Sequence, residues 1–401
     1  MTQKTQKQHI VVVGGGFGGV KTALELSKYP HYFEVTLISD RPDFWYFPTL
    51  YHTATGGTRL QSSIPIEHLI HKKPIQFIEG KATTIDREAK NITLEDKQVI
   101  PYDKIVFALG VVTNYFGIPG LPEFSYGVKS IAEAERLKRH LHQQIVDDGK
   151  PDINYVVVGG GPTGIELVGA LGRYVDYVAH RHGLPDRKIH VDLVENGKHL
   201  LPRMPKSVGR AVERQLRRLG VRLYLGQAVQ GETADELSVN GKPIRSHTVV
   251  WTAGQANNPF FNANNFPLGP HKKVAVDEFL RLKGDDNVFV IGDNAETMYS
   301  GMAQTAIYDA EFVADNFLRE DMGRPKLAYR PKKPVYVTPA GERWASVEWG
   351  PVNLYGWLGW FLREAADFVA FTDIEPLPDA ALQWAHALQR QDLCPICGSV
   401  S

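Results

Sequence analysis

The chain has 401 residues, a formal net charge of +0 and 43% hydrophobic residues. That length suits two or three domains of ordinary size, and the balanced charge gives no reason to expect nucleic acid as a partner. The only two cysteines, Cys394 and Cys397, stand at the extreme C-terminus, so a disulfide-stapled secreted fold is excluded and a reducing cytosol fits. The polar N-terminus shows no signal-peptide pattern, and no apolar run reaches the ~18 residues of a membrane-spanning helix.

The first unit of the chain opens on an apolar run that ends in a glycine motif. Residues 10–13 predict a buried parallel strand, and residues 18–28 predict the helix after it. Between them VVVGGGFGG carries G-x-G-x-x-G at Gly14, Gly16 and Gly19. In such a turn the first glycine relieves strain, the second lets a pyrophosphate approach, and the third lets the helix pack on the strand. The helix N-terminus then offers free N–H groups to the phosphates.

Further buried strands are expected in this unit. A strand over 35–38 ends at Ser39 and Asp40, either of which can hydrogen-bond a ribose. Residues 75–100 predict a β-meander inserted into the unit. Residues 104–109 then predict another buried strand.

A second unit repeats the pattern 145 residues further on. A strand over 154–158 runs into VVVGGGPTG, whose motif glycines are Gly159, Gly161 and Gly164. One glycine motif is weak evidence, because a tight turn before a helix has the same composition. Two copies, each with its own strand, indicate two dinucleotide sites in one chain. That arrangement favours electron transfer between two dinucleotides.

The carboxylate that ends the next strand distinguishes the second unit. Residues 190–194 predict a strand that ends at Glu195, where an acidic side chain hydrogen-bonds an adenosine ribose. A carboxylate there repels a 2′-phosphate, so NADH is favoured over NADPH. Lys198 and Arg203 lie nearby in sequence and would soften that preference. The stretch WTAG, which ends at Gly254, closes this unit.

After the second unit the chain returns to the first. Residues 287–291 predict a last apolar strand that leads into Gly292 and Asp293, and a helix is expected over about 303–318. Strands and helices alternate in both units, which predicts an α/β fold with mainly parallel, doubly wound sheets. The first unit is therefore discontinuous, and the second is inserted into it.

This combination of motifs resembles a known family. Two glycine motifs, the WTAG and an FVIGD near residue 290 are similar to those of the two-dinucleotide-binding flavoproteins of the pyridine nucleotide–disulfide reductase superfamily. The redox-active disulfide of the disulfide reductases is absent near the first helix. The stretches LYHTATGG, GGGPTGIELVGAL, VENGKHLLPRM and AQTA resemble the type II NADH:quinone oxidoreductases over about residues 10–320.

The resemblance implies FAD on the first unit and NADH, as a co-substrate, on the second. In that family the late aspartate binds the ribityl chain of the flavin, a role that falls here to Asp293. The implied FAD site consists of Gly14, Gly16, Gly19, Ser39, Asp40, Gly110, Gly292, Asp293 and Gln304. The implied NADH site consists of Gly159, Gly161, Gly164, Glu195 and Gly254.

Three residues are the catalytic candidates. The resemblance places Glu166, in the first turns of its helix, beside the flavin and the nicotinamide, where it could orient the nicotinamide or move protons. The alternative is a helix N-terminal carboxylate favoured by the macrodipole. The family's quinone signature A-Q-x-A-x-Q begins here at Ala303, with Gln304 as its first glutamine and Tyr308 in place of the second. A phenol also donates to a quinone carbonyl, and Gln304 could instead contact the flavin through its backbone.

The resemblance divides the chain into three parts. We expect an FAD domain over 1–118 and 255–325, and an NADH domain over 119–254. A C-terminal α+β module over 326–401 would serve as a membrane anchor or a dimerisation module. Cys394-Pro395-Ile396-Cys397 could be half of a zinc site, a redox dithiol or an exposed tail without a catalytic role. No other metal ligands are expected.

One stretch of the C-terminal module has a helical pattern. Residues 352–371 place apolar side chains on one face of a helix, and the opposite face carries Arg363, Glu364 and Asp367. Such a helix can lie in a membrane interface. It can also pack on the FAD domain or on a second subunit of a homodimer.

The sequence therefore predicts a flavoprotein oxidoreductase that transfers hydride from NADH to FAD and then electrons to a quinone, without proton pumping. We expect it in the cytoplasm, peripheral on the inner face of the cell membrane. One alternative is an NAD(P)H-dependent FAD reductase of a sulfur compound, a protein or another soluble acceptor. Another is a flavin-bound redox sensor or interaction protein whose tryptophan-rich tail recruits a partner.

Overall fold

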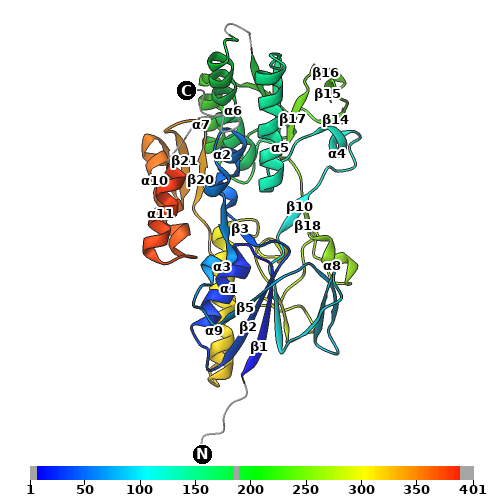
Figure 1. Ribbon diagram of the computed structural model, residues 1–401, viewed down its shortest axis with the longest axis vertical. Helices are drawn as coiled ribbons and strands as arrows, with labels where there is room; N and C mark the ends of the chain where they lie inside the picture. The colour runs from blue at the N-terminus through cyan, green and yellow to red at the C-terminus, as the bar shows by residue number, and fades with distance from the viewer. Residues whose placement is uncertain (1–6, 185–188, 389–401) are drawn as a thin grey trace, which may run out of the picture.

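The computed structural model describes residues 7–184 and 189–388 of the chain. Two parallel sheets lie one above the other along its longest axis, and the C-terminal elements run along one side of both (Figure 1). Strand β1 lies in the lower of the two sheets in this view.

The first sheet is fully parallel and has five strands. Their order is β5 (Ile75–Glu79), β2 (Phe33–Ser39), β1 (Gln8–Val13), β9 (Lys104–Phe107) and β19 (Val288–Val290). The helices α1 (Phe17–Ser27) and α9 (Ala303–Asp321) pack against each other beside it. Strand β1 is central and is almost completely buried from Ile10 to Val13, as a strand covered on both faces must be.

The second sheet repeats this order with one strand fewer. It runs β13 (Arg222–Leu225), β12 (His190–Glu195), β11 (Asn154–Val158) and β17 (Thr248–Trp251), again all parallel. The helices of this unit are α5 (Ile131–His142), α6 (Pro162–Arg181) and α7 (Lys206–Arg218). In both sheets the strand that leads into the glycine motif is internal. The predicted α/β fold with two Rossmann-like sheets is confirmed.

The expected meander over 75–100 is only partly correct. Strand β5 pairs with β2 in the first sheet, with Val35 opposite Ile75. Only β6 (Ala82–Asp86), β7 (Asn91–Leu94) and β8 (Val99–Pro101) form the antiparallel meander. The reason is that Phe77 and Ile78 of β5 pack into cores on opposite faces of the sheet, which an edge hairpin could not do.

Two short crossings join the two units. Strands β10 (Val111–Thr113) and β18 (Gln255–Asn257) pair antiparallel between the sheets. The fully buried Asn294 fastens both crossings, since its Nδ2 donates to the Gly110 carbonyl at 2.7 Å and to Asn257 Oδ1 at 2.8 Å. Its Oδ1 accepts from the Gly110 amide at 2.9 Å. Asn294 therefore ties the two crossing strands to each other at their ends in the first unit.

Smaller elements fill the remaining surface. They are β3 (Asp43–Trp45), α2 (Leu50–Ala54), β4 (Ser63–Pro65), α3 (Ile66–Leu69), α4 (Leu121–Phe124), β14 (Val229–Glu232), β15 (Glu236–Val239), β16 (Lys242–Arg245) and α8 (Pro259–Ala263). Strands β14, β15 and β16 form a second antiparallel sheet, which belongs to the second unit.

The C-terminal part has the predicted α+β character, but its helix is shorter than expected. Strands β20 (Tyr336–Pro339), β21 (Ala345–Trp349) and β22 (Val352–Gly356) form an antiparallel sheet, followed by α10 (Trp357–Thr372) and α11 (Leu377–Leu388). The segment 352–356, expected to be helical, is a strand. Gly356, with φ +77°, ends that strand, and a Cβ built on Gly359 would lie 2.2 Å from the Ala345 carbonyl oxygen. These two glycines let α10 turn back closely onto β21.

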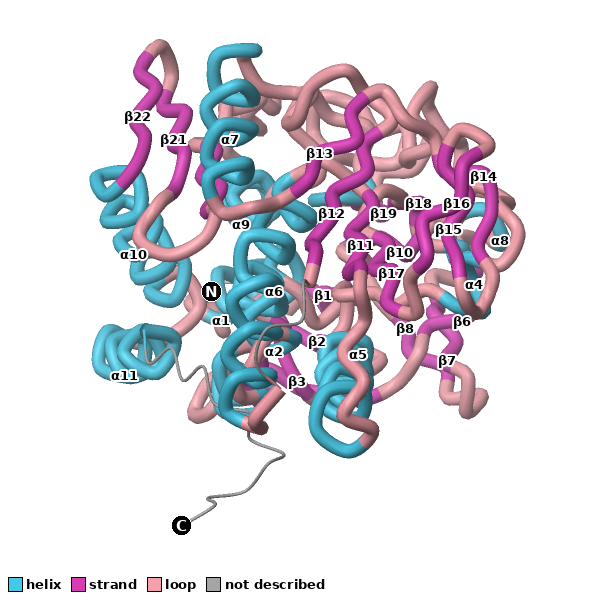
Figure 2. Tube along the Cα trace, turned by 90° about the horizontal axis from the view of Figure 1, so that it is seen from above, coloured by secondary structure: helices cyan, strands magenta, loops and turns pink. Residues whose placement is uncertain are grey.

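Helix α10 presents its apolar side outward, the reverse of the usual amphipathic arrangement. Trp357 is 64% exposed, Phe361 55% and Val369 57%. Arg363 and Asp367, by contrast, are buried against the protein. Viewed from above, α10 and α11 lie at the edge of the molecule, with α10 next to β21 and β22 (Figure 2). Within the described residues no helix is long and apolar enough to cross a membrane.

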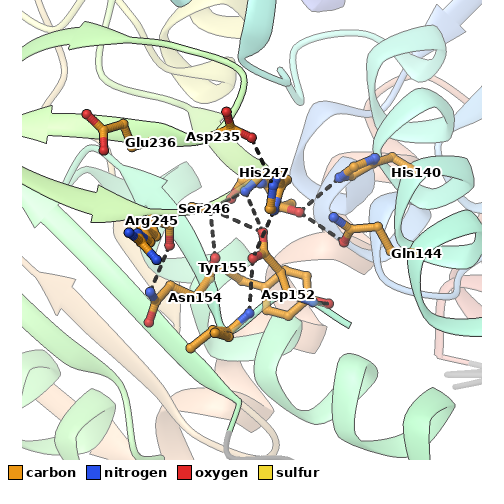
Figure 3. Close-up of polar contacts among 12 residues, drawn as sticks. His140, Gln144, Asp152, Asn154, Tyr155, Asp235, Glu236, Arg245, Ser246 and His247 are labelled. Carbon is orange, nitrogen blue, oxygen red and sulfur yellow. Dashed lines mark hydrogen bonds and ion pairs between the residues drawn. The ribbon is translucent and has the colours of Figure 1, made fainter. Parts of the chain in front are cut away.

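A polar network ties the amino ends of the strands in the second sheet (Figure 3). Asp152 Oδ2, just before β11, accepts from the His247 amide at 2.6 Å, and Ser246 Oγ donates to the Asn154 carbonyl at 2.7 Å. The His247 ring lies between Asp152, at 3.4 Å, and the exposed Asp235, at 3.3 Å. The network therefore fixes the start of the edge strand β17 to the start of its neighbour β11.

This network predicts a stability effect. Asp152→Ala leaves the His247 amide without its acceptor and should lower the free energy of unfolding by about 1–3 kcal/mol. Urea unfolding followed by circular dichroism measures it. Asp235→Ala removes the other carboxylate beside the same histidine, but this residue is on the surface, so a change below ~1 kcal/mol is expected. Equal losses in the two variants would contradict this account of the network.

Candidate active site between the two sheets

The first glycine motif is built as a dinucleotide-binding turn. Gly14 has φ +129°, and a Cβ built on it would lie 2.2 Å from the Ala108 carbonyl oxygen. A Cβ on Gly19 would lie 1.8 Å from the Gly14 carbonyl oxygen. A Cβ on Gly16 meets no protein atom within 4 Å. The protein's own packing therefore requires the outer glycines, whereas the middle one leaves the backbone open for the close approach of a pyrophosphate.

The second motif has the same geometry. Gly159 has φ +120°, and its Cβ would lie 2.6 Å from Thr252 Oγ1. The Cβ of Gly164 would lie 1.9 Å from the Gly159 carbonyl oxygen, and that of Gly161 meets nothing within 4 Å. Both turns thus fit a dinucleotide, and both precede the N-terminus of a long helix.

The strand-end residues differ between the two units. Both carboxylate oxygens of Glu195 accept backbone amides, from Gly160 at 2.6 Å and from Gly197 at 2.5 Å. In the first unit Ser39 takes the equivalent place, because a Cβ on Gly15 would lie 2.3 Å from its Oγ. Asp40 is exposed and pairs with Arg41 at 3.1 Å. Of the two ribose candidates, Ser39 lies against the glycine turn, and Asp40 is exposed beside Arg41.

Three cations surround Asp293 in the turn after β19. Burial raises the pKa of Asp293, while Lys273, Lys129 and Arg203 oppose that shift. Lys129 also donates to the Gly254 carbonyl at 2.9 Å, and burial lowers its pKa to about 8. Through Lys129 the structure brings Gly254 of the second unit and Asp293 of the first to one site.

Arg203 lies elsewhere than the sequence implies. Its Nη1 is 3.5 Å from a Cβ built on Gly301, a residue of the first unit. Its charge acts on Asp293, so the structure gives it a place beside the first unit's site.

Glu166, near the start of α6, lies close to the inward face of α10. The residue keeps some accessible surface, yet the protein packed around it raises its pKa to about 8. The Arg363 guanidinium opposes that rise and the Asp367 carboxylate adds to it. A carboxyl group that titrates near neutral pH is suited to proton transfer.

Arg363 and Asp367 form a buried ion pair on α10 that reaches the first unit. The Tyr46 hydroxyl donates to Asp367, and Arg363 Nη2 donates to the Pro48 carbonyl at 3.4 Å. The neighbouring carboxylate and burial raise the pKa of Tyr46, and the pair raises that of Arg363. A buried pair of this kind is costly to break, because either partner alone is an uncompensated charge.

A narrow pocket of about 10 Å³ opens beside this ion pair. Its lining comes from the loop after β3, from α2, from α10 and from α11, and consists of Thr49, Tyr51, His52, Arg363, Glu364, Asp367 and Ala387. It has room for one water molecule, so a ring-sized ligand would require side chains to move.

Gln304 and Tyr308 both point to the segment that follows α9. Gln304 Oε1 accepts from the Val335 amide at 3.0 Å, and the Tyr308 hydroxyl donates to the Arg330 carbonyl at 3.1 Å. The Lys332 ammonium stands 4.0 Å from the centroid of the Tyr308 ring. These two side chains therefore bond to the segment after α9, whereas the charges that act on Glu166 are Arg363 and Asp367, with Tyr46 bound to Asp367.

Sequence reasoning missed those three residues. The sequence places Arg363 and Asp367 on the helix face opposite the apolar one, but it does not show that this face is buried against Tyr46 and Glu166. The signal in the sequence is the strongly apolar face of the predicted helix, which is consistent with the charged face being the one turned inward. The Cys394–Cys397 pair lies outside the described residues, among which no group of three or more metal-ligating side chains occurs.

A family model described as pyridine nucleotide-disulphide oxidoreductase matches residues 8–310. The chain belongs to this family. Among the proteins similar to this chain is a type II NADH:quinone oxidoreductase of Staphylococcus saprophyticus. It is 26% identical, over 80% of this chain and 84% of that protein. The type II NADH:quinone oxidoreductase Ndh of Mycobacterium tuberculosis is 28% identical over 92% of this chain and 86% of its own.

Solved structures share the fold of this pyridine nucleotide-disulphide oxidoreductase. NDH2 from Plasmodium falciparum, in complex with NADH, superposes with a TM-score of 0.84 at 17% identity, covering 97% of this chain and 100% of that one. The sulfide:quinone oxidoreductase of Aquifex aeolicus gives a TM-score of 0.74 at 23% identity, covering 90% and 89%. The first comparison includes the C-terminal part of the chain, which the family model does not reach.

The raised pKa of Glu166 predicts how stability depends on pH. A carboxyl group with a pKa of about 8 in the folded state and 4.5 as its ordinary value binds its proton more tightly when folded. Its contribution to stability is therefore present below about pH 4.5 and is lost as the pH rises through about 8. Glu166→Gln should gain in melting temperature over the original protein as the pH increases from 5 to 9.

The measurement is differential scanning fluorimetry at several pH values, with the exposed Glu123→Gln as a control. A melting-temperature difference that stays constant over this range for Glu166→Gln would contradict the raised pKa.

Proposed function

We propose that this protein is an FAD-dependent NADH:quinone oxidoreductase, which takes hydride from NADH and passes electrons to a quinone without pumping protons. The observation that carries the proposal is the pair of equivalent glycine turns, joined at Lys129. The names of the relatives, type II NADH:quinone oxidoreductases, support the choice of donor and acceptor.

FAD would bind to the first unit. Its pyrophosphate would lie on the amides around Gly16 and at the N-terminus of α1. Ser39 and Asp293 would hold the adenosine ribose and the ribityl chain, with Gly110 and Gly292 lining the site. When bound, the flavin supplies two-electron acceptance from NADH and stepwise release of electrons to a quinone.

NADH would bind to the second unit. The amides around Gly161 would hold its pyrophosphate, and Glu195 would accept the ribose hydroxyls in place of its present backbone donors. Gly254 would lie beside the nicotinamide. Glu166 would hold a proton or release it near the reacting rings, since burial raises its pKa to about 8 while Arg363 opposes that rise.

The acceptor would approach through the pocket beside the ion pair on α10. This pocket lies where the first unit, α10 and α11 meet, next to Glu166's partners Arg363 and Asp367. Gln304, at the N-terminus of α9, would contribute backbone contacts to the flavin. Tyr308 is bound to the Arg330 carbonyl, which favours a structural role for it over quinone binding.

The outward apolar face of the C-terminal part would lie on the membrane surface, on the inner side of the cell membrane. The C-terminal module carries large exposed apolar side chains on two strands and two helices. They are Trp349, Val352, Tyr355, Trp357, Leu358, Phe361, Val369, Leu377 and Leu382. An exposed apolar face of this size marks a membrane or protein contact. A lipophilic acceptor favours the membrane, and a homodimer is the competing interpretation.

We also propose the division into an FAD domain over 1–118 and 255–325, an NADH domain over 119–254 and a C-terminal module over 326–401. The antiparallel pairing of β10 with β18 supports it, since the chain crosses between the two sheets at these strands.

One spectroscopic experiment tests the reaction. The purified protein should show an oxidised flavin spectrum, NADH should bleach it, and a short-chain quinone should restore it. Gly16→Val should purify without flavin, whereas Gly161→Val should keep the flavin and raise the KM for NADH at least ~10-fold, because neither side chain meets protein atoms.

The failures are distinct. A colourless protein would refute the whole proposal. Bleaching without recovery by any quinone would refute only the acceptor and would favour a sulfur, protein or soluble acceptor. Slow turnover with every acceptor, together with tight binding of a partner, would favour a redox sensor.

The membrane contact predicts a loss of binding. The double variant Trp357→Ser with Phe361→Ser removes two aromatic side chains worth about 1.5–3 kcal/mol each when buried, so partitioning to phospholipid vesicles should fall at least ~10-fold. Vesicle sedimentation measures it. Val99→Ser, an exposed apolar residue of the meander, should bind as the original protein does. Unchanged vesicle binding, with a dimer that dissociates in the double variant, would instead assign this face to the homodimer.

A further inference from the structure

A strap of residues 326–335 follows α9 and runs back along it. Side chains of α9 hold the strap at three places. The contacts are Asn316 Oδ1 with the Leu327 amide at 2.8 Å, the Tyr308 hydroxyl with the Arg330 carbonyl at 3.1 Å, and Gln304 Oε1 with the Val335 amide at 3.0 Å. The strap then leads into β20 of the C-terminal sheet, so it joins that sheet to the helix whose N-terminus faces the flavin site.

Tyr329 is the strap side chain that reaches a buried carboxylate. Its hydroxyl donates to Asp309 Oδ1 at 2.6 Å, and its ring meets that of Phe312 edge-on at 5.2 Å. Its amide donates to the Glu278 carbonyl at 2.6 Å, which fixes the backbone on the other side. Asp309, on α9, is fully buried. No residue of the glycine motifs takes part in these contacts.

The second oxygen of Asp309 holds the turn that contains the flavin ligand. Asp309 Oδ2 accepts from the Gly292 amide at 2.9 Å. The Gly292 carbonyl accepts from Ser300 Oγ at 2.8 Å, and Lys273 donates to the same Ser300 Oγ at 2.6 Å. Gly292 has φ +64°, a left-handed conformation, so the turn needs fixing from both sides. The next residue, Asp293, is the proposed ribityl ligand.

The chemistry of Asp309 suits this task. A carboxylate is an acceptor only, so the ionised side chain can accept both the Gly292 amide and the Tyr329 hydroxyl. Burial raises its pKa to about 6, the Tyr329 and Gly292 hydrogen bonds oppose that rise, and the nearby Asp293 carboxylate adds to it. At neutral pH the carboxylate is therefore charged and binds both donors strongly. When protonated it becomes a donor at one oxygen and no longer matches two donors.

We propose that Asp309 and Tyr329 are a positioning pair for FAD, which holds the Gly292–Asp293 turn in its binding geometry, so that the strap is part of the flavin site. The proposal rests on FAD occupying the first unit. It also gives a role to Tyr308, which stands where the family signature has its second glutamine. The Tyr308 hydroxyl holds the strap at the Arg330 carbonyl. The next residue of the helix is Asp309, the carboxylate that Tyr329 of the strap contacts.

The test is the affinity for FAD. Tyr329→Phe removes one donor, leaves a buried carboxylate oxygen unpaired, and should raise the dissociation constant of FAD about 10-fold at pH 7.5. Flavin fluorescence during reconstitution of the deflavinated full-length protein measures it. Tyr102→Phe is the matched control, since this buried hydroxyl has no hydrogen-bond partner among the described residues, and its FAD affinity should stay within about twofold.

The pH profile separates positioning from general loss of packing. FAD affinity of the original protein should fall as the pH decreases through about 6. In Tyr329→Phe this midpoint should move to higher pH, because the hydrogen bond that lowers the pKa of Asp309 is gone. In Asp309→Asn the inflection should disappear, with FAD affinity reduced at every pH.

Each result decides the matter. Unchanged FAD affinity in Tyr329→Phe, or an inflection near pH 6 that persists in Asp309→Asn, would overturn the positioning pair while leaving the flavoenzyme assignment intact. An original protein that binds no FAD would overturn both. If Tyr329→Phe does not fold, as judged by circular dichroism, the profile of Asp309→Asn alone carries the test.

Discussion

The close contact of helix and strand at each glycine turn is the constraint on which the rest of the molecule depends. A Cβ on Gly19 would lie 1.8 Å from the Gly14 carbonyl oxygen, and a Cβ on Gly164 would lie 1.9 Å from the Gly159 carbonyl oxygen. Each helix N-terminus is therefore brought directly above the end of its strand. Any larger side chain would force helix and sheet apart. The same packing that completes the two cores therefore also aims the free amides of α1 and α6 at the place where a dinucleotide would bind.

A second level of organisation joins the two turns into one site. Asn294 fastens both crossings, and Lys129 of the second unit donates to Gly254 while its charge acts on Asp293. Asn294 and Asp293 follow the carboxyl end of β19, where parallel sheets expose their ligand-binding edge. Asn294 thus fixes the two crossing strands to each other, and the charge of Lys129 links the second unit to Asp293 of the first.

The C-terminal part closes the site with a helix, α10, whose charged face points inward and whose apolar face points outward. Because Arg363 and Asp367 face inward, they perturb Glu166 and tie α10 to Tyr46 of the first unit, and the apolar side chains of α10 are left outside. Burying the ion pair is costly unless its geometry is complete, which the contacts with Tyr46 and the Pro48 carbonyl provide. The charges that act on Glu166 and the outward apolar surface are two consequences of one helix orientation.

The sequence by itself determined the two glycine turns, the parallel strands beside them and the strand-end Glu195, because these depend on local backbone requirements and on apolar runs a few residues long. It left β5 in the meander, extended α10 into β22 and did not show which face of α10 is buried. Only the tertiary structure decided these, together with the links from Asn294 to the crossings and from Tyr329 through Asp309 to Gly292. The reason is that each joins segments far apart in the chain: a buried charge or amide is defined by the partner that satisfies it, and no periodicity in the sequence identifies that partner.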